Sequence, residues 1–350
     1  MTAPYPWQTH AWSILCRTRR EAKLGHAWLL CGRAGTGKVE FAHRFAQLAL
    51  CEDIAADSAP CGECRSCHLF HAGNHPDFRL LVPVDDARSI GIDQVRALGD
   101  FFALKTHYGR AKIALLRPAD VMTRAAANAL LKLLEEPPAL GLFILVTDHL
   151  ARLPPTIRSR CQRLALDHID PTQALEWLRR QSPETSPADV HQAYLLSYQA
   201  PLATLPALAA GDLELASKVQ TQMLAVAAGR VHAVQAAQAV GEVAPSRLAD
   251  LMLGNAHRMV LHMSGVTAAA SACEWEDRSG EPGHAGHCGV NSPINPLNSR
   301  QVFEFVTAAL EVKAMAVPSA NFRPGDMIDM LWQAWMKATR VMSRKVSQSA

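Results

Sequence analysis

The residues whose types and spacing could bind phosphate lie at positions 32–39, which read GRAGTGKV. The pattern G-x-x-x-x-G-K is typical of a loop whose backbone N–H groups surround a phosphate at a helix N-terminus. Gly32, Gly35 and Gly37 let the backbone wrap the anion, and Lys38 would add a positive charge. The next position, where Ser or Thr would hold magnesium, is Val39, which offers no oxygen. The loop therefore predicts a nucleotide-type fold without ordinary magnesium chemistry.

The carboxylates of a working ATPase are also missing from their expected place. In such an enzyme an apolar strand ends in an Asp that holds magnesium and a Glu that orients the attacking water. The matching run here, residues 112–116, continues into Arg117 and Pro118. Asp120 follows three residues too far along for the same geometry. Val39 and Arg117-Pro118 are thus two independent losses on the magnesium side.

Four cysteines have the spacing of a metal site, C-x9-C-x2-C-x2-C. Two-residue spacing lets two thiolates bind one ion from a tight turn, and four thiolates form a closed zinc site with no open position for catalysis. The alternative is four unrelated buried thiols. The weakest of the four assignments is Cys51, for which His71 or His75 is an alternative ligand. The four cysteines are Cys51, Cys61, Cys64 and Cys67.

A second group with ligand chemistry lies in a Gly-, His- and Pro-rich segment, residues 265–298, which we expect to be a long loop without an assigned role. Its spacing is loose, and two of its members are adjacent, so we expect one metal ion per chain rather than two. Trp275, in the same segment, could stack on a base. The group comprises Cys273, His284, His287 and Cys288.

The elements that must position these residues follow from hydrophobic periodicity. Short apolar runs alternate with helical patterns up to about residue 167, which predicts a parallel sheet with covering helices. The strongest helix pattern is 124–136, which ends at two prolines. Beyond residue 167 the pattern is helical throughout. The predicted strands are 27–31, 78–82, 113–116, 142–147 and 163–166, and the later helices are 171–180, 188–208, 213–228, 232–240, 245–264, 299–317 and 324–346.

Composition excludes several classes of protein. A chain of 350 residues that is 49% hydrophobic is long enough for two or three domains with a hydrophobic core. Its net charge of +3 is too small to indicate nucleic-acid binding by itself. We expect no signal peptide and no membrane span. Nine cysteines, four of them clustered, favour a reduced, cytoplasmic protein with a metal site over a disulfide framework.

Taken together, these residues resemble the bacterial clamp-loader family of AAA+ proteins, the loaders of DNA polymerase III. The match is firm over residues 1–165, and the helical remainder fits only in kind. Besides the cysteines, the segments that carry it are Tyr5-Pro6-Trp7, His75-Pro76-Asp77, GIDQVR at 91–96, AAANALLKLLEEPP at 125–138 and Ser159-Arg160-Cys161.

The resemblance implies three domains: an AAA+ parallel-sheet domain at 1–167 with an inserted zinc module at about 51–67, a helical lid at 168–210, and a C-terminal helical collar at 211–350. It implies a subunit that does not hydrolyse ATP, joined by its collar to gamma/tau and delta subunits in a ring that loads the sliding clamp on primed DNA. Thr147 would lie at the degenerate nucleotide site. Arg160, with Ser159, would complete a neighbour's ATP site in trans. The family's ATPase subunits carry an arginine in the lid, and no arginine occurs here between Arg180 and Arg230.

Two other functions stay open from the sequence. The chain could be an autonomous P-loop ATPase of the gamma/tau kind, if Asp120 or Glu135 supplied the magnesium ligand. It could also be a zinc-dependent nucleic-acid-binding protein, although residues 61–67 contain one arginine and no aromatic residue. If the chain is instead the non-hydrolysing clamp-loader subunit, structural Zn²⁺ is the expected cofactor, and ATP or ADP binds weakly if at all.

Overall fold

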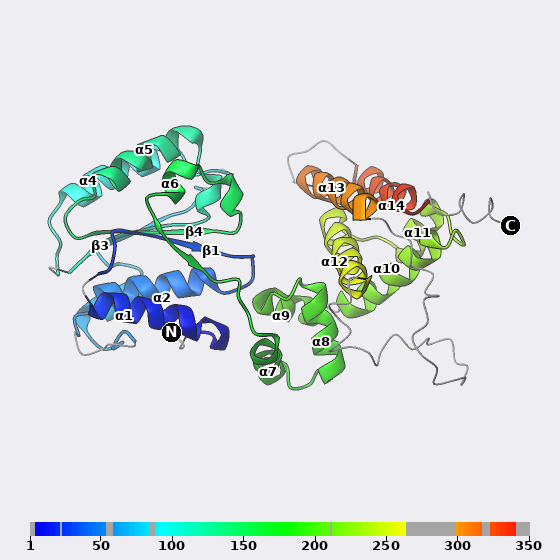
Figure 1. The fold of residues 1–350 in the computed structure, drawn as a ribbon, viewed down its shortest axis with the longest axis horizontal. Helices are drawn as coiled ribbons and strands as arrows, with labels where there is room; N and C mark the ends of the chain where they lie inside the picture. Colours follow the sequence, from blue (N-terminus) through cyan, green and yellow to red (C-terminus); the bar gives the residue numbers. More distant parts are fainter. Residues whose placement is uncertain are drawn as a thin grey trace. The chain divides into compact units, whose positions relative to one another are not determined.

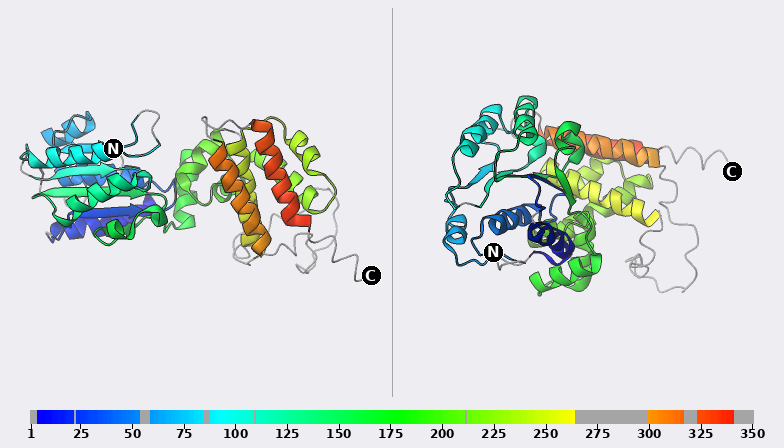
Figure 2. Two further views of the ribbon diagram at one scale, coloured as in Figure 1. Left: turned by 90° about the horizontal axis from the view of Figure 1, so that it is seen from above. Right: turned by 60° about the vertical axis from the view of Figure 1, so that its left-hand side comes forward.

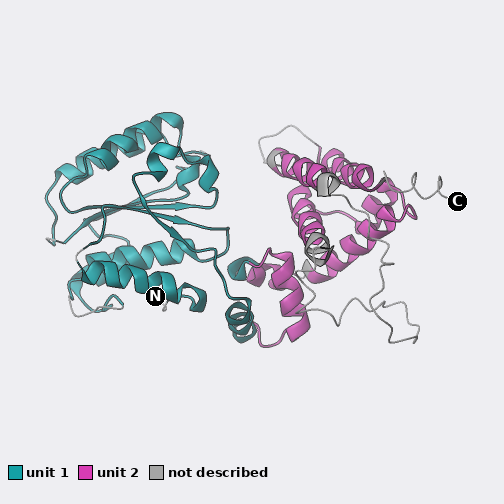
Figure 3. Cartoon of the chain, in the orientation of Figure 1, with its two compact units in different colours: residues 1–181, 200–203 teal, residues 182–199, 204–350 magenta. Residues whose placement is uncertain are grey.

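The computed structural model describes residues 4–21, 23–53, 59–84, 88–108, 110–210, 212–263, 299–316 and 323–340. Residues 265–298, with Trp275 and the second cysteine and histidine group, lie outside this part of the chain. The chain divides into two compact units (Figure 3). Unit 1 comprises residues 1–181 and 200–203, and unit 2 comprises residues 182–199 and 204–350.

Unit 1 is built on a five-stranded parallel sheet in the order β2-β3-β4-β1-β5. The three central strands are almost wholly buried because helices cover both faces, and this is why they read as continuous apolar runs rather than alternating ones. The strands are β1 (Ala27–Cys31), β2 (Phe78–Leu81), β3 (Lys112–Leu116), β4 (Gly141–Thr147) and β5 (Gln162–Ala165).

Two helix layers enclose the sheet (Figure 1). Helices α1 (Thr9–Arg20), α2 (Lys38–Leu50) and α3 (Arg65–His71) pack on one face, and α4 (Ile92–Ala103), α5 (Arg124–Glu135) and α6 (Pro155–Arg158) pack on the other. Figure 2 shows these layers from two other directions. Short 3-10 turns lie at Pro6–Gln8, Ala119–Val121 and Leu150–Arg152, and α7 (Pro171–Gln181) completes the unit.

Unit 2 is entirely helical in its described residues, and its core centres on Trp332, Trp335 and Phe305. The indole N–H of Trp335 donates to the Met223 carbonyl at 2.8 Å, so this buried polar atom is satisfied. The helices are α8 (Pro187–Leu196), α9 (Pro201–Ala209, whose first residues belong to unit 1), α10 (Asp212–Ala227), α11 (Ala233–Val240), α12 (Pro245–Met263), α13 (Ser299–Met315) and α14 (Pro324–Arg340).

The predicted α/β plus all-α class is confirmed, and each predicted strand lies within one residue of its predicted ends. One helix prediction was wrong. Residues 188–208 form two helices rather than one, because Tyr198 and Gln199 adopt positive φ values of 54° and 58° and Pro201 begins the next helix. The domain boundaries at 167 and 210 stay a prediction. Among the described residues, no helix is long and apolar enough to cross a membrane.

Candidate functional site

The predicted phosphate loop connects β1 to α2, as such loops must. Gly35 and Gly37 have φ values of 76° and 84°, a left-handed backbone that favours glycine, and Gly37 caps the N-terminus of α2. The glycines of the motif therefore have a structural reason in this chain whether or not a phosphate binds.

Side chains from the N-terminal segment occupy the carbonyl side of the loop. The amide nitrogen of Gln8 donates to the carbonyl oxygens of Thr36 and Gly37, each at 2.9 Å. The indole of Trp7 donates to the same Thr36 oxygen at 3.0 Å. Gln8 is buried, so these hydrogen bonds hold the loop to the chain's own N-terminus.

The crest of the loop is covered by the start of α9. The Leu202 N–H donates to the Gly35 carbonyl at 3.0 Å. A Cβ atom at Gly35 would lie 2.9 Å from the Cβ of Ala203 and 3.1 Å from that of Ala200. The start of α9 thus packs directly on Gly35 of the loop.

The lysine of the motif is engaged by the protein itself. The Lys38 side chain is only 3% exposed, and its Nζ lies 2.6 Å from a carboxylate oxygen of Asp148, just after β4. It also donates to the Arg33 carbonyl. A buried ammonium needs such partners, because an isolated buried charge is very costly. The Asp148 carboxylate therefore balances the positive charge of Lys38.

The side chains expected on the magnesium side of the site have other partners in the described part of the chain. Val39 packs against the hydrophobic core of the α1–α2 face. The Asp120 carboxylate accepts a hydrogen bond from the Thr147 hydroxyl at 2.7 Å, and Glu135 forms an ion pair with Arg160 at 2.7 Å. The two carboxylates that the autonomous-ATPase hypothesis requires are thus both held by side chains of this protein.

An aromatic cluster that the sequence does not predict lies beside the loop. Tyr5 stacks on Trp7, and Trp177 of α7 contacts both rings edge-on at centroid distances of 5.5 and 5.3 Å. A Cβ at Gly37 would lie 2.6 Å from the Tyr5 ring. Tyr5 and Trp7 were singled out in the sequence, but no local signal pairs them with Trp177, because α7 follows some 170 residues later.

Arg160 lies in the turn between α6 and β5. Its Nη1 donates to the Thr156 carbonyl at 3.0 Å and is 3.4 Å from the Ser159 hydroxyl, while Nη2 contacts Glu135. The arginine side chain is 36% exposed, so part of the guanidinium can still meet another molecule. In contrast, burial raises the pKa of the Cys161 thiol to about 12, which keeps that thiol neutral.

The four clustered cysteines converge. Their sulfur atoms all lie within 4.8 Å of one another, with Cys51 Sγ 3.5 Å from Cys61 Sγ and Cys61 Sγ 4.0 Å from Cys67 Sγ. Four thiolates bound to one zinc ion at about 2.3 Å would stand roughly 3.8 Å apart, so the donor set fits a tetrahedral ion. The cluster could hold a metal.

Backbone N–H groups point at these sulfur atoms, as in a tight metal-binding turn. The N–H of Cys64 donates to Cys61 Sγ at 3.4 Å, and the N–H of Cys67 donates to Cys64 Sγ at 3.3 Å. The first of these bonds, with that from Glu63, lowers the pKa of the Cys61 thiol to about 7. Burial raises the pKa of the Cys51 and Cys67 thiols. A bound cation would offset that desolvation.

The histidines proposed as alternatives to Cys51 have other partners. His71 Nε2 lies 2.9 Å from the Gln47 amide nitrogen. His75 is buried, its Nε2 lies 2.8 Å from the Ser66 hydroxyl, and its Nδ1 accepts from the Asp77 N–H at 3.1 Å. The structure therefore favours Cys51 as the fourth donor and ties the module to the sheet domain through Ser66 and His75.

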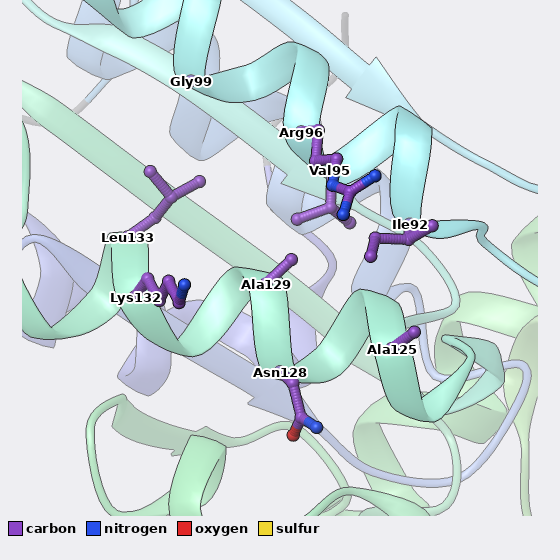
Figure 4. Close-up of a pocket in the computed structure, with 9 residues that line it drawn as sticks. All are labelled: Ile92, Val95, Arg96, Gly99, Ala125, Asn128, Ala129, Lys132 and Leu133. Carbon is purple, nitrogen blue, oxygen red and sulfur yellow. The ribbon is translucent and has the colours of Figure 1, made fainter.

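A groove of about 490 Å³ runs between α4 and α5, on the face of the sheet that these two helices cover (Figure 4). Its lining is mainly apolar, including Val95 and Leu133, and its polar and charged residues are Asn128, Arg96 and Lys132. Its lining residues offer no carboxylate or thiol, so this groove has neither the donors of a metal site nor those of an acid–base pair.

Comparison with known proteins shows which family this chain resembles in sequence. Residues 7–170 match a family model described as DNA polymerase III, delta subunit. A DNA polymerase III subunit delta' from Pseudomonas aeruginosa is 41% identical over 198 residues, which cover 57% of this chain and 59% of that protein. The delta' subunit from Escherichia coli is 35% identical over 246 residues, which cover 70% of this chain and 72% of that protein.

The chain belongs to the DNA polymerase III delta-prime family. It spans about 60% of the length of the first relatives it matches, and the alignments with tau/gamma subunits cover less of those proteins: 32% of the one from Haemophilus influenzae, at 34% identity over 62% of this chain. The predicted resemblance to the loaders of DNA polymerase III and the predicted parallel-sheet domain are confirmed.

Proposed function

We propose that this chain is the delta-prime subunit of a replicative clamp loader, a ring member that does not hydrolyse ATP but helps to load the sliding clamp on primed DNA. The observation that carries the proposal is the contrast within unit 1. Lys38, which an ATPase would use on phosphate, is buried against Asp148, whereas Arg160 is exposed. The chain's family membership supports the same conclusion.

The contacts of the phosphate loop support the proposed catalytic silence. A nucleotide phosphate that used Lys38 would have to displace Asp148 from it. Even then Val39 and Arg117 would supply no magnesium ligand. Because phosphoryl transfer depends on a metal ion that neutralises the developing charge, we infer no turnover and at most weak binding of ATP or ADP.

The proposed role of Arg160 is to act on a neighbour's nucleotide. An arginine supplied in trans stabilises the charge on the transferred phosphoryl group and typically accelerates hydrolysis by about 10³–10⁵-fold. The neighbour would be a gamma/tau subunit, which carries the intact ATP site. The helices of unit 2 would join this chain to gamma/tau and delta in the ring, and the assembly would bind clamp and DNA in the cytoplasm.

The cysteine cluster would hold a structural Zn²⁺ through Cys51, Cys61, Cys64 and Cys67. With four protein ligands the ion would keep no open position, so it would contribute folding free energy to the module rather than catalysis. No observation in the described residues favours the alternative of a zinc-dependent nucleic-acid-binding protein.

The test of the trans role uses a reconstituted loader containing gamma/tau, delta and this chain. The Arg160→Ala variant should assemble normally and lower the clamp- and DNA-stimulated ATPase rate. Arg180→Ala is the matched control, since Arg180 is an exposed arginine paired only along its own helix with Glu176 at 3.4 Å. A stimulated rate that is unchanged by Arg160→Ala would show that this arginine does not act in trans.

The autonomous-ATPase alternative has a separate test. The isolated chain is incubated with ATP and magnesium, beside a Lys38→Ala variant. We expect no turnover above background from either. Turnover by the wild type that disappears in the variant would establish an active site in cis and overturn the proposed silence.

A further inference from the structure

We infer that Glu135 is a positioning residue that orients the Arg160 guanidinium for a phosphate group of a neighbouring subunit. The inference rests on the proposed trans role of Arg160 and assigns a function to a residue that would otherwise be an ordinary surface glutamate. Two separate elements, the C-terminal ends of α5 and α6, hold the Arg160 side chain.

The guanidinium is held by both of its terminal nitrogens. Nη1 contacts the Thr156 carbonyl at 3.0 Å and the Ser159 hydroxyl at 3.4 Å, and Nη2 contacts a Glu135 carboxylate oxygen at 2.7 Å. Since a guanidinium is planar, fixing both nitrogens fixes the plane. It has five N–H donors, and these contacts engage three, which leaves two for the oxygen atoms of a phosphate.

The two elements that supply these contacts are rigidly placed. Leu134, next to Glu135, and Ile157, in α6, are 2% and 0% exposed and belong to the same hydrophobic core. The Leu134 carbonyl at the end of α5 is also 3.1 Å from the His26 ring nitrogen. Glu135 is therefore a half-exposed side chain on an anchored backbone, which suits a residue that directs a flexible neighbour.

Electrostatics explain why the pair forms in the free chain. A glutamate in the last turn of a helix opposes the helix dipole, and Glu136 adds a second negative charge there. The ion pair with Arg160 offsets the charge of Glu135. Glu135 is 50% exposed and Arg160 is 36% exposed, so solvent screens their ion pair and makes it weak. The pair therefore orients the guanidinium without binding it strongly. Such a weak pair positions the arginine without preventing its contact with phosphate.

The experiment is a double-variant cycle in the reconstituted loader, in which the kcat and the KM for ATP of the stimulated hydrolysis are measured. Glu135→Ala should lower kcat roughly 2- to 5-fold, the effect expected of one solvent-exposed ion pair, with little change in KM. Glu135→Gln, which keeps an oxygen acceptor, should lie between Glu135→Ala and the wild type. Glu136→Ala removes a neighbouring glutamate and should behave like the wild type.

The decisive comparison is the Arg160→Ala background. If Glu135 acts through Arg160, Glu135→Ala will change nothing there. A decrease that persists without the arginine, no effect of Glu135→Ala beside a clear effect of Arg160→Ala, or an increase in kcat, which would mean that Glu135 competes with phosphate, each overturns the inference while the trans role stands. If Arg160→Ala itself has no effect, the proposed function fails, and this inference fails with it.

Discussion

The pairing of Lys38 with Asp148 makes a prediction that separates an inherited phosphate loop from a working one. In an ATPase the lysine is held ready for phosphate, whereas here it is built into the protein interior. Replacing Asp148 with alanine removes the carboxylate from the Lys38 ammonium, which is 3% exposed, and leaves its hydrogen bond to the Arg33 carbonyl. The variant should therefore have a lower free energy of unfolding than the wild type.

The magnitude follows from the burial of the two partners. Breaking a fully buried ion pair by removing one member costs about 3–5 kcal/mol, and an exposed pair contributes less than about 1 kcal/mol. Lys38 is buried, but Asp148 is 38% exposed, so solvent can partly reach the site. We expect Asp148→Ala to lower the free energy of unfolding by about 1–3 kcal/mol. The additional change Lys38→Met removes the unpaired charge and should recover about 1 kcal/mol or more.

The assay is urea-induced unfolding of the intact chain, with wild type, both single variants and the double variant compared at the same pH and salt concentration. Asp93→Ala is the matched control, because Asp93 is 92% exposed and its ion pair with Arg96 is 3.5 Å long. It should change the free energy of unfolding by less than about 0.5 kcal/mol. Millimolar ATP with magnesium should not stabilise the wild type, whereas a ligand at a hundred times its dissociation constant would add about 2.7 kcal/mol.

Three results would refute this reasoning. If Asp148→Ala costs no more than Asp93→Ala, or if Lys38→Met recovers nothing in its presence, Lys38 does not depend on Asp148. If ATP raises the stability of the wild type, the loop exchanges its internal partners for phosphate readily, and the structural interpretation of the motif is wrong.

Two further predictions concern the cysteines and the pH dependence. Cys64→Ser should release one zinc ion per chain and lower the melting temperature, while Cys16→Ser, which changes a cysteine outside the cluster, should retain the metal; equal zinc content in both variants by metal analysis would contradict the site. Burial, assisted by the Arg117 charge and opposed by Glu40, holds the pKa of His43 below its ordinary value of 6.5. The unfolded chain therefore takes up more protons, so this histidine's contribution to stability is complete above about pH 6.5 and declines as the pH falls, by at most about 1.4 kcal/mol per pH unit. His43→Gln should flatten that part of the stability profile, and an unchanged slope between pH 6.5 and 5 would contradict the assignment.

The sequence located the strands well because their signal is local. Residues 27–31 and 112–116 are continuous apolar runs, and the structure buries them on both faces between helix layers. The helix boundary at 197–200 was missed because a positive φ at Tyr198 and Gln199 is not a preference of those residue types; it arises where α8 ends and Pro201 starts the next helix.

The losses on the magnesium side could also be predicted from sequence, because the motif fixes which side chain must supply each oxygen. Val39 and Arg117 cannot do so in any fold. The cysteine spacing likewise predicted a cluster, since two-residue spacing forces neighbouring thiols together, but it left Cys51, His71 and His75 as alternatives until the partners of the histidines were known.

What this sequence determined by itself was therefore the class of the fold, the family resemblance and the lack of an oxygen-bearing side chain at positions 39 and 117, all of which depend on residues close together in the chain. Tertiary structure decided the partners of the charged groups. Lys38 meets Asp148 and Arg160 meets Glu135 because parallel strands and their connections bring distant loops to shared edges of the sheet. No local preference encodes such pairs, since a charge finds its partner by position in space rather than by distance along the chain.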